Sequence, residues 1–353
     1  MPMKQPSKFK GKAIYEPSGA AYEYCHWACN LYNGCSNTCS YCYNRHGITS
    51  AILGVETVSL KKSLIDEKTA FAIFEKELVQ AKKLMKPTDS LFFSFVSDPM
   101  LSETRDLTTM CVEHALEEGV KVQVLTKCTD WVFLPRYTKE LQLFADSIAI
   151  GFTLTGMESM ESYCRNNTAQ RIKAMEKLKK LGIKTFASIE PVVDINKAVN
   201  VVRKAKPYCD FFKVGLVTKM GVKFSKEQVE ELVAKVQFYV GGETPIYWKK
   251  SIRDIVGDEL VDSWENSVPS DYDLFNPVTT KTMTQKQKNI LGNAWRIALI
   301  VAILAIAIYG AVNGKTKMCH SCYRNFRETY LPDTTKVCPF CGYKFVNVES
   351  VHK

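Results

Sequence analysis

The sequence predicts an α/β protein built on a parallel sheet that is closed or partly closed into a barrel. Two observations indicate this fold class. Short apolar runs alternate with stretches of helical periodicity along residues 24–255, a pattern typical of strand–helix units with parallel strands. The runs are apolar at successive positions, as strands are when helices cover both faces of a sheet. With 353 residues, of which 46% are hydrophobic, the chain is long enough for one large domain and a small one.

The expected elements follow one another in a regular order. Strands are predicted at 91–96, 121–126, 148–154, 184–190, 211–216 and, as a short run, 245–248. Helices are predicted near 66–85, 104–118, 168–181, 194–205 and 225–238. In the third of these helices, Ile172, Met175 and Leu178 recur at helical spacing, while lysines occupy another face. The alternation therefore places the carboxyl ends of several strands at one end of the barrel.

Three closely spaced cysteines suggest the chemistry. Cys35, Cys39 and Cys42 have the spacing C-x3-C-x2-C, with Tyr41 directly before the third. Thiolates favour zinc and iron–sulfur clusters, and both a structural zinc site and a 4Fe–4S cluster usually take four protein ligands. Three cysteines without a local fourth indicate a cluster with one iron left open for a substrate or cofactor.

This motif resembles the radical S-adenosylmethionine (SAM) superfamily. The flanking runs Asn30–Cys35 and Cys39–Arg45 are similar to the spore-photoproduct-lyase-like branch, and the resemblance spans roughly residues 22–255. It implies a partial (β/α)6 TIM-type barrel with a first strand near 27–34 followed by the cluster loop. It also implies that the open iron of a 4Fe–4S cluster chelates SAM, whose reductive cleavage gives methionine and a 5′-deoxyadenosyl radical.

The resemblance and the strand ends together nominate the pocket, because barrel sites form at the carboxyl ends of strands. Ser97 and Asp98 occupy the place of the family's Gly-Gly-Glu-type segment, although the glycines are absent here; helix capping is the alternative. The other expected cofactor-binding residues are Tyr41, Thr126, Lys127, Thr153 and Thr155. Packing, capping or solvation is the alternative for each of them.

Two residues are predicted to be catalytic. Glu190 ends the strand at 184–190, and a carboxylate in a barrel mouth is costly to bury without a partner. Its expected partners are Arg171, Lys213 or Lys249. Cys164 follows the strand at 148–154 and is the candidate hydrogen donor, although no donor motif of the photoproduct lyases is matched closely. A free buried thiol is the alternative for Cys164.

Composition limits the compartment and the partners. Seven of the 13 cysteines fall into the triad and two later CxxC pairs, which is ligand spacing and predicts a reducing, cytoplasmic setting. Residues 283–353 hold ten Lys and Arg against three Asp and Glu, whereas residues 1–282 hold 37 against 34. The near-neutral barrel region therefore gives no charge argument for a phosphate-binding surface.

The C-terminal part has a different character. Residues 297–312 carry no charge, so the segment 295–312 is expected to form either a short membrane helix or a buried helix, since a full span needs about 20 apolar residues. A zinc ribbon is predicted from four cysteines whose spacing suits one tetrahedral site: Cys319, Cys322, Cys338 and Cys341. The expected segments are a basic arm at 1–23, the barrel at 24–255, a linker at 256–289, the apolar helix at 290–313 and the ribbon at 314–353.

These observations predict a radical SAM enzyme with three cofactors: a 4Fe–4S cluster, SAM and zinc. An electron donor such as flavodoxin or ferredoxin is the expected partner. The first substrate hypothesis is a nucleic-acid component, acted on by a lyase or modifying enzyme. A peptide or small metabolite is the second. The third hypothesis is a membrane-tethered zinc-ribbon interaction protein with a vestigial barrel, which places the chain in the cytoplasm but on a membrane.

Overall fold

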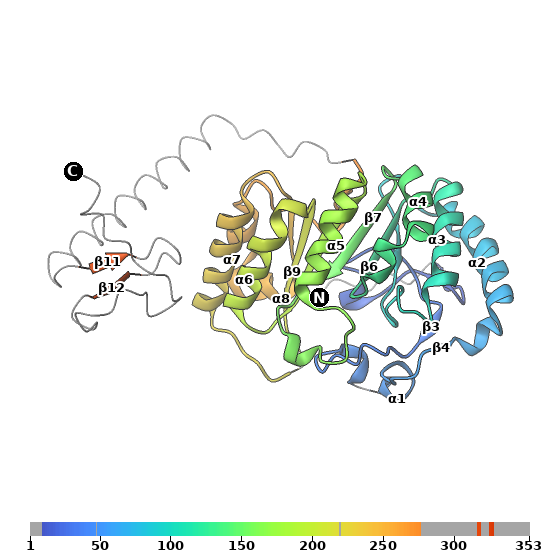
Figure 1. The fold of residues 1–353 in the computed structure, drawn as a ribbon, viewed down its shortest axis with the longest axis horizontal. Coiled ribbons are helices and arrows are strands. Elements are labelled where there is room, and N and C mark those ends of the chain that lie inside the picture. Colours follow the sequence, from blue (N-terminus) through green and yellow to red (C-terminus); the bar gives the residue numbers. More distant parts are fainter. Residues whose placement is uncertain (1–8, 47, 219, 277–315, 319–324, 328–353) are drawn as a thin grey trace, which may run out of the picture. The chain divides into compact units, whose positions relative to one another are not determined.

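The computed structural model describes residues 9–46, 48–218, 220–276, 316–318 and 325–327. The chain divides into two compact units, residues 1–281 and 282–353. The first unit holds the large sheet and its helices (Figure 1). In the second unit, the described residues form two antiparallel strands, β11 (Thr316–Met318) and β12 (Asn325–Arg327).

The sheet of the first unit has eight strands in chain order. Seven of them run parallel, and β1 pairs antiparallel with β2 at one edge. From this edge the strands are β1 (Ile14–Tyr15), β2 (Trp27–Cys29), β5 (Leu91–Phe93), β6 (Val122–Thr126), β7 (Ile148–Thr153), β8 (Lys184–Val192), β9 (Phe211–Leu216) and β10 (Ile246–Trp248). The predicted α/β fold with a mostly parallel sheet is confirmed, and it is consistent with a partial radical SAM barrel.

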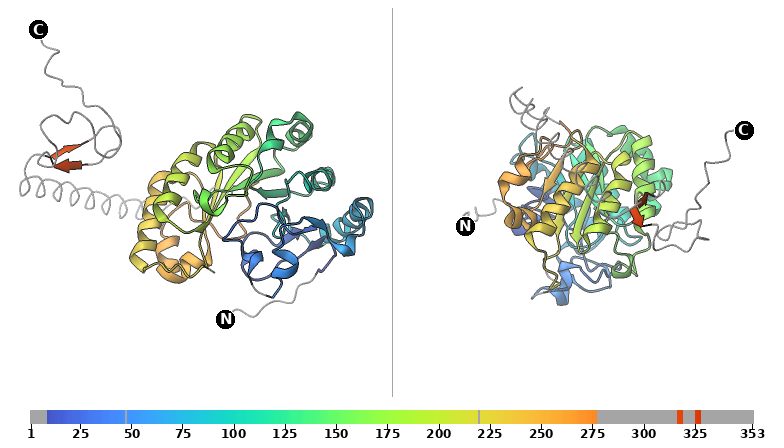
Figure 2. Two further views of the ribbon diagram at one scale, coloured as in Figure 1. Left: turned by 60° about the horizontal axis from the view of Figure 1, so that its bottom comes forward. Right: turned by 90° about the vertical axis from the view of Figure 1, so that its left-hand side faces the viewer.

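Helices follow the outside of the curved sheet, most of them between successive parallel strands and the last two after β10 (Figure 2). They are α2 (Glu67–Lys82), α3 (Arg105–Glu117), α4 (Pro135–Leu143), α5 (Thr168–Lys180), α6 (Ile195–Ala205), α7 (Lys226–Val240), α8 (Lys250–Val256) and α9 (Asp258–Asp262). Their starts are encoded locally. Asn167 and Ser225 form capping boxes with the glutamines three residues later, which satisfies amides that have no partner within the helix.

The first strand differs from its predicted range. Residues 27–34 do not form one strand, because β2 ends at Cys29 and Tyr32–Asn33 forms β3, which pairs with β4 (Ser59–Leu60). The Asn30 side chain accepts a hydrogen bond from Phe95 N at 2.9 Å. The chain thus leaves the sheet after Cys29, and the short helix α1 (Ser50–Leu53) lies in the same excursion.

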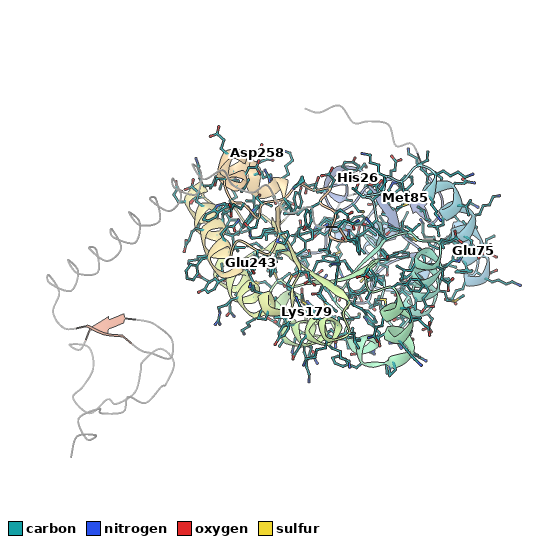
Figure 3. The ribbon with its side chains drawn as sticks, turned by 90° about the horizontal axis from the view of Figure 1, so that it is seen from above. His26, Glu75, Met85, Lys179, Glu243 and Asp258 are labelled. Atoms are coloured by element: carbon teal, nitrogen blue, oxygen red, sulfur yellow. The ribbon has the colours of Figure 1, made fainter. Side chains whose placement is uncertain are left out.

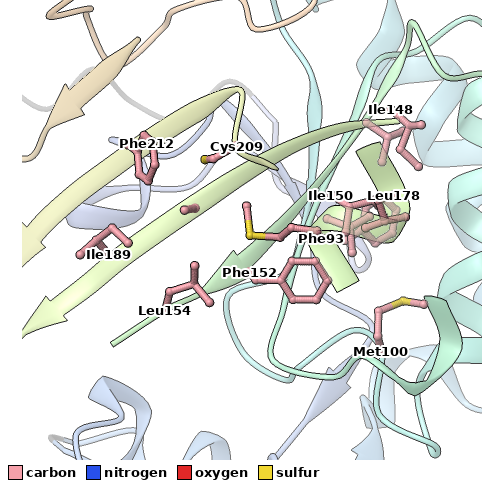
Figure 4. Packing of buried hydrophobic residues seen from close by; sticks show 14 of the residues in the cluster. Phe93, Met100, Ile148, Ile150, Phe152, Leu154, Leu178, Ile189, Cys209 and Phe212 are labelled. Atoms are coloured by element: carbon pink, nitrogen blue, oxygen red, sulfur yellow. The ribbon is translucent and has the colours of Figure 1, made fainter. Parts of the chain in front are cut away.

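A continuous core lies between the sheet and the helices. Ile148, Ile150 and Phe152 of β7 pack with Leu178 of α5 and with apolar residues of β8 and β9 (Figure 4). Charged side chains such as Lys179, Glu243 and Asp258 lie at the periphery (Figure 3). The fully buried strands explain the apolar sequence runs, because both faces of the sheet are covered.

The segment predicted as a linker from residue 256 begins as part of the first unit. Val261, Val268 and Leu274 are buried in its apolar cores, and Asn266 donates hydrogen bonds to the carbonyls of Gly241 and Thr244 at 2.8 Å. Because the segment is mostly polar, its few apolar side chains could not be recognised from the sequence as core residues.

Two predictions concern residues outside the described part of the chain. They are the apolar helix at 290–313, including the segment 295–312, and the zinc site of Cys319, Cys322, Cys338 and Cys341. Among the described residues, no helix has the length and apolar character that crossing a membrane requires.

Lys213, on β9, is a buried lysine whose protonation should make the stability of the protein depend on pH. Its amine donates to the carbonyl of Tyr24 at 2.8 Å. The pKa of Lys213 is lowered to about 7, chiefly by burial and also by the charge of Lys249, while Cys25 and Glu190 act in the opposite direction. Between about pH 7 and 10.5, the Lys213 amine is protonated in the unfolded chain and neutral in the folded chain. The free energy of unfolding should therefore rise with pH over this range. The slope is at most about 1.4 kcal/mol per pH unit.

Lys213→Met should remove this slope from urea unfolding curves measured between pH 7 and 10.5. Lys179→Met, which removes an exposed lysine, should keep it. An unchanged slope in Lys213→Met would show that the amine is not neutral in the folded protein.

Candidate functional site

A cavity of about 460 Å³ opens at the carboxyl ends of the strands. The loop after β3 supplies one wall, and the ends of β5 to β9 supply others. The segment from Ser18 to Tyr24 and Lys249, directly after β10, complete the lining. Its polar lining includes Cys35, Cys39, Tyr41, Cys42, Ser97, Asp98, Thr126, Lys127, Thr153, Ser188, Glu190 and Lys249. Side chains that are distant in the sequence therefore meet in one place.

The three cysteines occupy a short loop whose backbone is tightly fixed. Gly34 precedes them with φ +76°, and a Cβ there would lie 2.2 Å from the Thr57 carbonyl oxygen. Glycine is therefore required for the close approach of the two segments. Cys35 N donates to Val55 O at 2.9 Å, and Cys42 N donates to Cys39 O at 3.0 Å. These bonds fix the loop, and all three cysteines line the cavity.

The chemistry of this donor set fits a 4Fe–4S cluster. A hydrogen bond from Cys164 lowers the pKa of Cys39 to about 6 despite burial, and thiolates are the ligands that iron–sulfur clusters take. Among the described residues, no three His, Cys, Asp or Glu side chains gather around a position for a single metal ion. Ligands that each bind a different iron of a cluster lie farther apart than ligands of one ion.

The cavity also contains an unpaired polar group beside the triad. Ser97 is 5% exposed and lines the cavity, and its buried hydroxyl oxygen has no hydrogen-bond partner among the described residues. Buried polar groups in folded proteins are normally paired. Ser97 is therefore suited to a polar ligand such as SAM, which carries amino, carboxylate and ribose groups.

Asp98 joins the cysteine loop to the strand ends. Its Oδ1 accepts from Thr126 Oγ1 and from Met100 N, and its Oδ2 accepts from Asn37 Nδ2 and Lys127 N, over 2.5–3.0 Å. These four bonds use the hydrogen-bonding capacity of the carboxylate. Asp98 thus organises the cavity wall between the triad and β6.

A buried ion pair supports the same wall from behind. Arg171 and Glu161 are 0% and 2% exposed and lie 2.6 Å apart. Arg171 also donates to the carbonyls of Lys127, Thr153 and Asn166. Glu161 accepts from the Tyr41 hydroxyl and, at 3.0 Å, from Thr155 Oγ1. The pair therefore connects α5 to two strand ends and to the cysteine loop.

A second polar cluster lies at the ends of β8 and β10. Lys249 Nζ donates to both oxygens of Glu190, at 2.8 and 2.9 Å, and lies 3.5 Å from Glu23. The Tyr24 hydroxyl donates to Glu190 at 2.8 Å and also contacts the Ser188 hydroxyl. Burial and the charge of Glu190 raise the pKa of Tyr24 well above its usual value, so this hydroxyl keeps its proton.

Most of the residues predicted from the sequence line the cavity. The exceptions are Thr155 and Cys164, which do not line the cavity. The predicted residues that line it are the three cysteines, Ser97, Asp98, Glu190 and the other strand-end groups. Thr155 is 2% exposed and bonds to Glu161 and Met157 N, which is the capping alternative. Lys249 is the partner of Glu190, since Arg171 pairs with Glu161 and Lys213 bonds to Tyr24.

Sequence reasoning missed Tyr24, Asn37 and Glu161. Tyr24 lies between β1 and β2, ahead of the first parallel strand, where no strand-end argument applies, and Glu161 lies in an irregular loop. Asn37 is inside the cysteine motif, so the sequence indicated that it lies near the cluster loop. The sequence did not indicate its hydrogen bond to Asp98. Their contacts join segments that are far apart in the chain, and no local pattern encodes them.

Comparisons with known proteins give a family match and a relative. Residues 29–196 match the family model of the radical SAM superfamily. A protein of Methanocaldococcus jannaschii, itself uncharacterised, is 26% identical over 263 residues, covering 70% of this chain and 91% of the relative.

Solved structures with similar chains include spore photoproduct lyase bound to AdoMet and a dinucleoside spore photoproduct. It shows 13% identity and a TM-score of 0.47, covering 66% of this chain and 78% of that chain. Another is SuiB of Streptococcus suis bound to S-adenosylmethionine, with 16% identity and a TM-score of 0.39, covering 57% of this chain and 46% of SuiB. The match to the radical SAM family model includes the cysteine triad and the ends of β5 to β8.

Proposed function

We propose that this protein is a radical SAM enzyme that cleaves SAM reductively and acts on a substrate bound in the same cavity. The observation that carries the proposal is the convergence of Cys35, Cys39 and Cys42 with polar strand ends on one cavity. When bound, the 4Fe–4S cluster supplies the electron for SAM cleavage, and SAM supplies the 5′-deoxyadenosyl radical.

The protein's own residues bind, orient and shield these groups. The three thiolates hold the cluster, and the unpaired hydroxyl of Ser97 offers a hydrogen bond to SAM. Lys127 lies with its amine 5.6 Å from the centre of the Tyr41 ring, and both line the cavity next to the triad. Apolar side chains of Phe95, Leu125 and others in the lining exclude water from a reactive intermediate.

The polar cluster of Tyr24, Glu190 and Lys249 is the proposed substrate side of the cavity. Glu190 retains a 24% exposed side chain, while its partner Lys249 is 6% exposed. We propose a nucleic-acid component as the first substrate class, acted on in a lyase or modification reaction. The near-neutral charge of residues 1–282 favours the alternative class, a peptide or small metabolite.

The test is release of 5′-deoxyadenosine from SAM by the anaerobically reconstituted full chain with dithionite. DNA, RNA and peptide pools are added separately, with a pool-free reaction as reference. Stimulation by a nucleic-acid pool supports the first class, and stimulation by the peptide pool supports the second. A chain loaded with its cluster that releases no 5′-deoxyadenosine under any condition would refute the proposed function.

Lys249→Met should reduce turnover of the pool that responds. The substitution leaves Glu190 without the cation that holds both of its oxygens, so the carboxylate loses its position. We expect a loss of about tenfold or more, which is the scale of one charge-assisted hydrogen bond. The measurement is the pool-stimulated rate of 5′-deoxyadenosine release at equal cluster content, compared with the unmodified chain.

The control for this prediction is Lys250→Met. Lys250 is the next residue, is 72% exposed and pairs with Asp254 on the surface. Its replacement should leave turnover unchanged. Equal losses in the two variants would contradict a specific role for the bond between Lys249 and Glu190.

A further inference from the structure

Cys164 lies against the cysteine triad without facing the cavity. Its Sγ is 3.5 Å from the Sγ of Cys39, yet Cys164 is not among the residues that line the cavity. It belongs to the loop between β7 and α5. Two sulfurs from segments 125 residues apart thus meet beside the triad, one from a residue that lines the cavity and one from a residue that does not.

The contact is fixed from both sides. Cys164 N donates to Glu161 O at 2.8 Å, and Ser40 N donates to Met160 O at 2.9 Å. The second bond ties the triad loop to the Cys164 loop one residue away from Cys39. Glu161 is itself held by the buried Arg171. The sulfur–sulfur contact therefore follows from a rigid backbone frame.

The hydrogen in this contact must come from Cys164. A cysteine that ligates iron is a thiolate and has no proton to donate. The Cys164 thiol has one hydrogen and two acceptors within reach, Cys39 Sγ at 3.5 Å and Asn37 O at 3.6 Å. With the cluster bound, Cys39 Sγ is a thiolate as well as the closer of the two acceptors, so the Cys164 hydrogen bonds to Cys39.

We propose that Cys164 is a positioning residue that donates an S–H···S hydrogen bond to Cys39 and thereby raises the reduction potential of the cluster. The inference rests on the proposed function, because it requires a cluster on the triad. Reduction adds negative charge that is shared by the cluster sulfurs. A donor to one of these sulfurs stabilises the reduced state more than the oxidised state.

The experiment compares Cys164→Ala and Cys164→Ser with the unmodified full chain after anaerobic reconstitution. Iron and sulfide per chain are measured first, and the midpoint potential is then measured by EPR-monitored titration. The alanine variant should keep its cluster while its reduction equilibrium shifts about three- to tenfold toward the oxidised form, where tenfold equals about 59 mV for one electron. The serine variant keeps a donor and should lie between the two.

Cys209→Ala is the matched control. Cys209 is a buried free thiol that bonds to Phe211 O at 3.1 Å, before the start of β9 and so at the opposite end of the strands from the triad. Its replacement should leave the potential unchanged. The control separates an effect on Cys39 from a general effect of losing a buried thiol.

The other outcomes each overturn a distinct claim. A potential in Cys164→Ala equal to that of the control would overturn the hydrogen bond. Loss of iron from both Cys164 variants, with native circular dichroism, would show that Cys164 is a ligand and overturn the donor role. Absence of a cluster from the unmodified chain would instead refute the proposed function itself.

Discussion

Replacing Cys39 by alanine is expected to abolish the cluster and, with it, reductive SAM cleavage. Cys39 is 4% exposed, lines the cavity and is the triad member with the pKa lowered to about 6. Removing one of three thiolates leaves two protein ligands for four irons. Iron and sulfide should fall to background after anaerobic reconstitution, and 5′-deoxyadenosine release should fall to the rate of cluster-free protein.

Cys111→Ala is the control for this prediction. Cys111 is a buried free cysteine on α3 and does not line the cavity. That variant should load iron and cleave SAM as the unmodified chain does. If Cys39→Ala retained a full cluster and cleaved SAM, the triad would not be the cluster site, and the central assignment would fail.

The strands and the cysteine triad could be predicted because their signals are local. The runs at 122–126, 148–153 and 211–216 are buried on both faces, so apolar sequence alone marks them. The triad is recognisable because ligand spacing must match cluster geometry within one loop. The parallel topology then places Ser97 and Glu190 at the same edge, which is why strand-end reasoning found much of the cavity.

The missing parts depend on contacts between distant segments. The four donors to Asp98 come from residues 37, 100, 126 and 127, and this convergence is a property of the folded chain. Helix α4 was missed because Pro135 opens it and only Tyr137, Thr138 and Leu141 are buried, too few for a clear apolar period. The partner of Glu190 was one of three lysines or arginines that sequence alone did not distinguish.

Breaking the ion pair between Arg171 and Glu161 is expected to give the largest loss of stability. Both side chains are almost fully buried, and removing one partner leaves the other as an uncompensated buried charge. Arg171→Met and Glu161→Gln should each lower the free energy of unfolding by about 3–5 kcal/mol. Urea unfolding followed by circular dichroism would measure the loss.

Lys179→Met provides the comparison with an exposed pair. Lys179 and Asp210 lie 2.8 Å apart, but their side chains are 42% and 31% exposed. Solvent screens such a pair, so the expected loss is only about 0–1 kcal/mol. A loss of this size in Arg171→Met would show that solvent reaches the Arg171 site in the folded protein.

The two single variants should differ in a predictable way. Arg171→Met also deprives the carbonyls of Lys127, Thr153 and Asn166 of their donor, whereas Glu161→Gln keeps an oxygen for Tyr41 and Thr155. Arg171→Met should therefore be the less stable variant.

A double variant measures the contribution of the ion pair itself. Glu161→Gln combined with Arg171→Met buries no charge, so its loss should be smaller than the sum of the two single losses. Additive losses would mean that the two side chains stabilise the protein independently, Arg171 through its bonds to the carbonyls and not through the ion pair. In that case Arg171→Met alone should impair cluster loading, because Glu161→Gln leaves those carbonyl bonds in place.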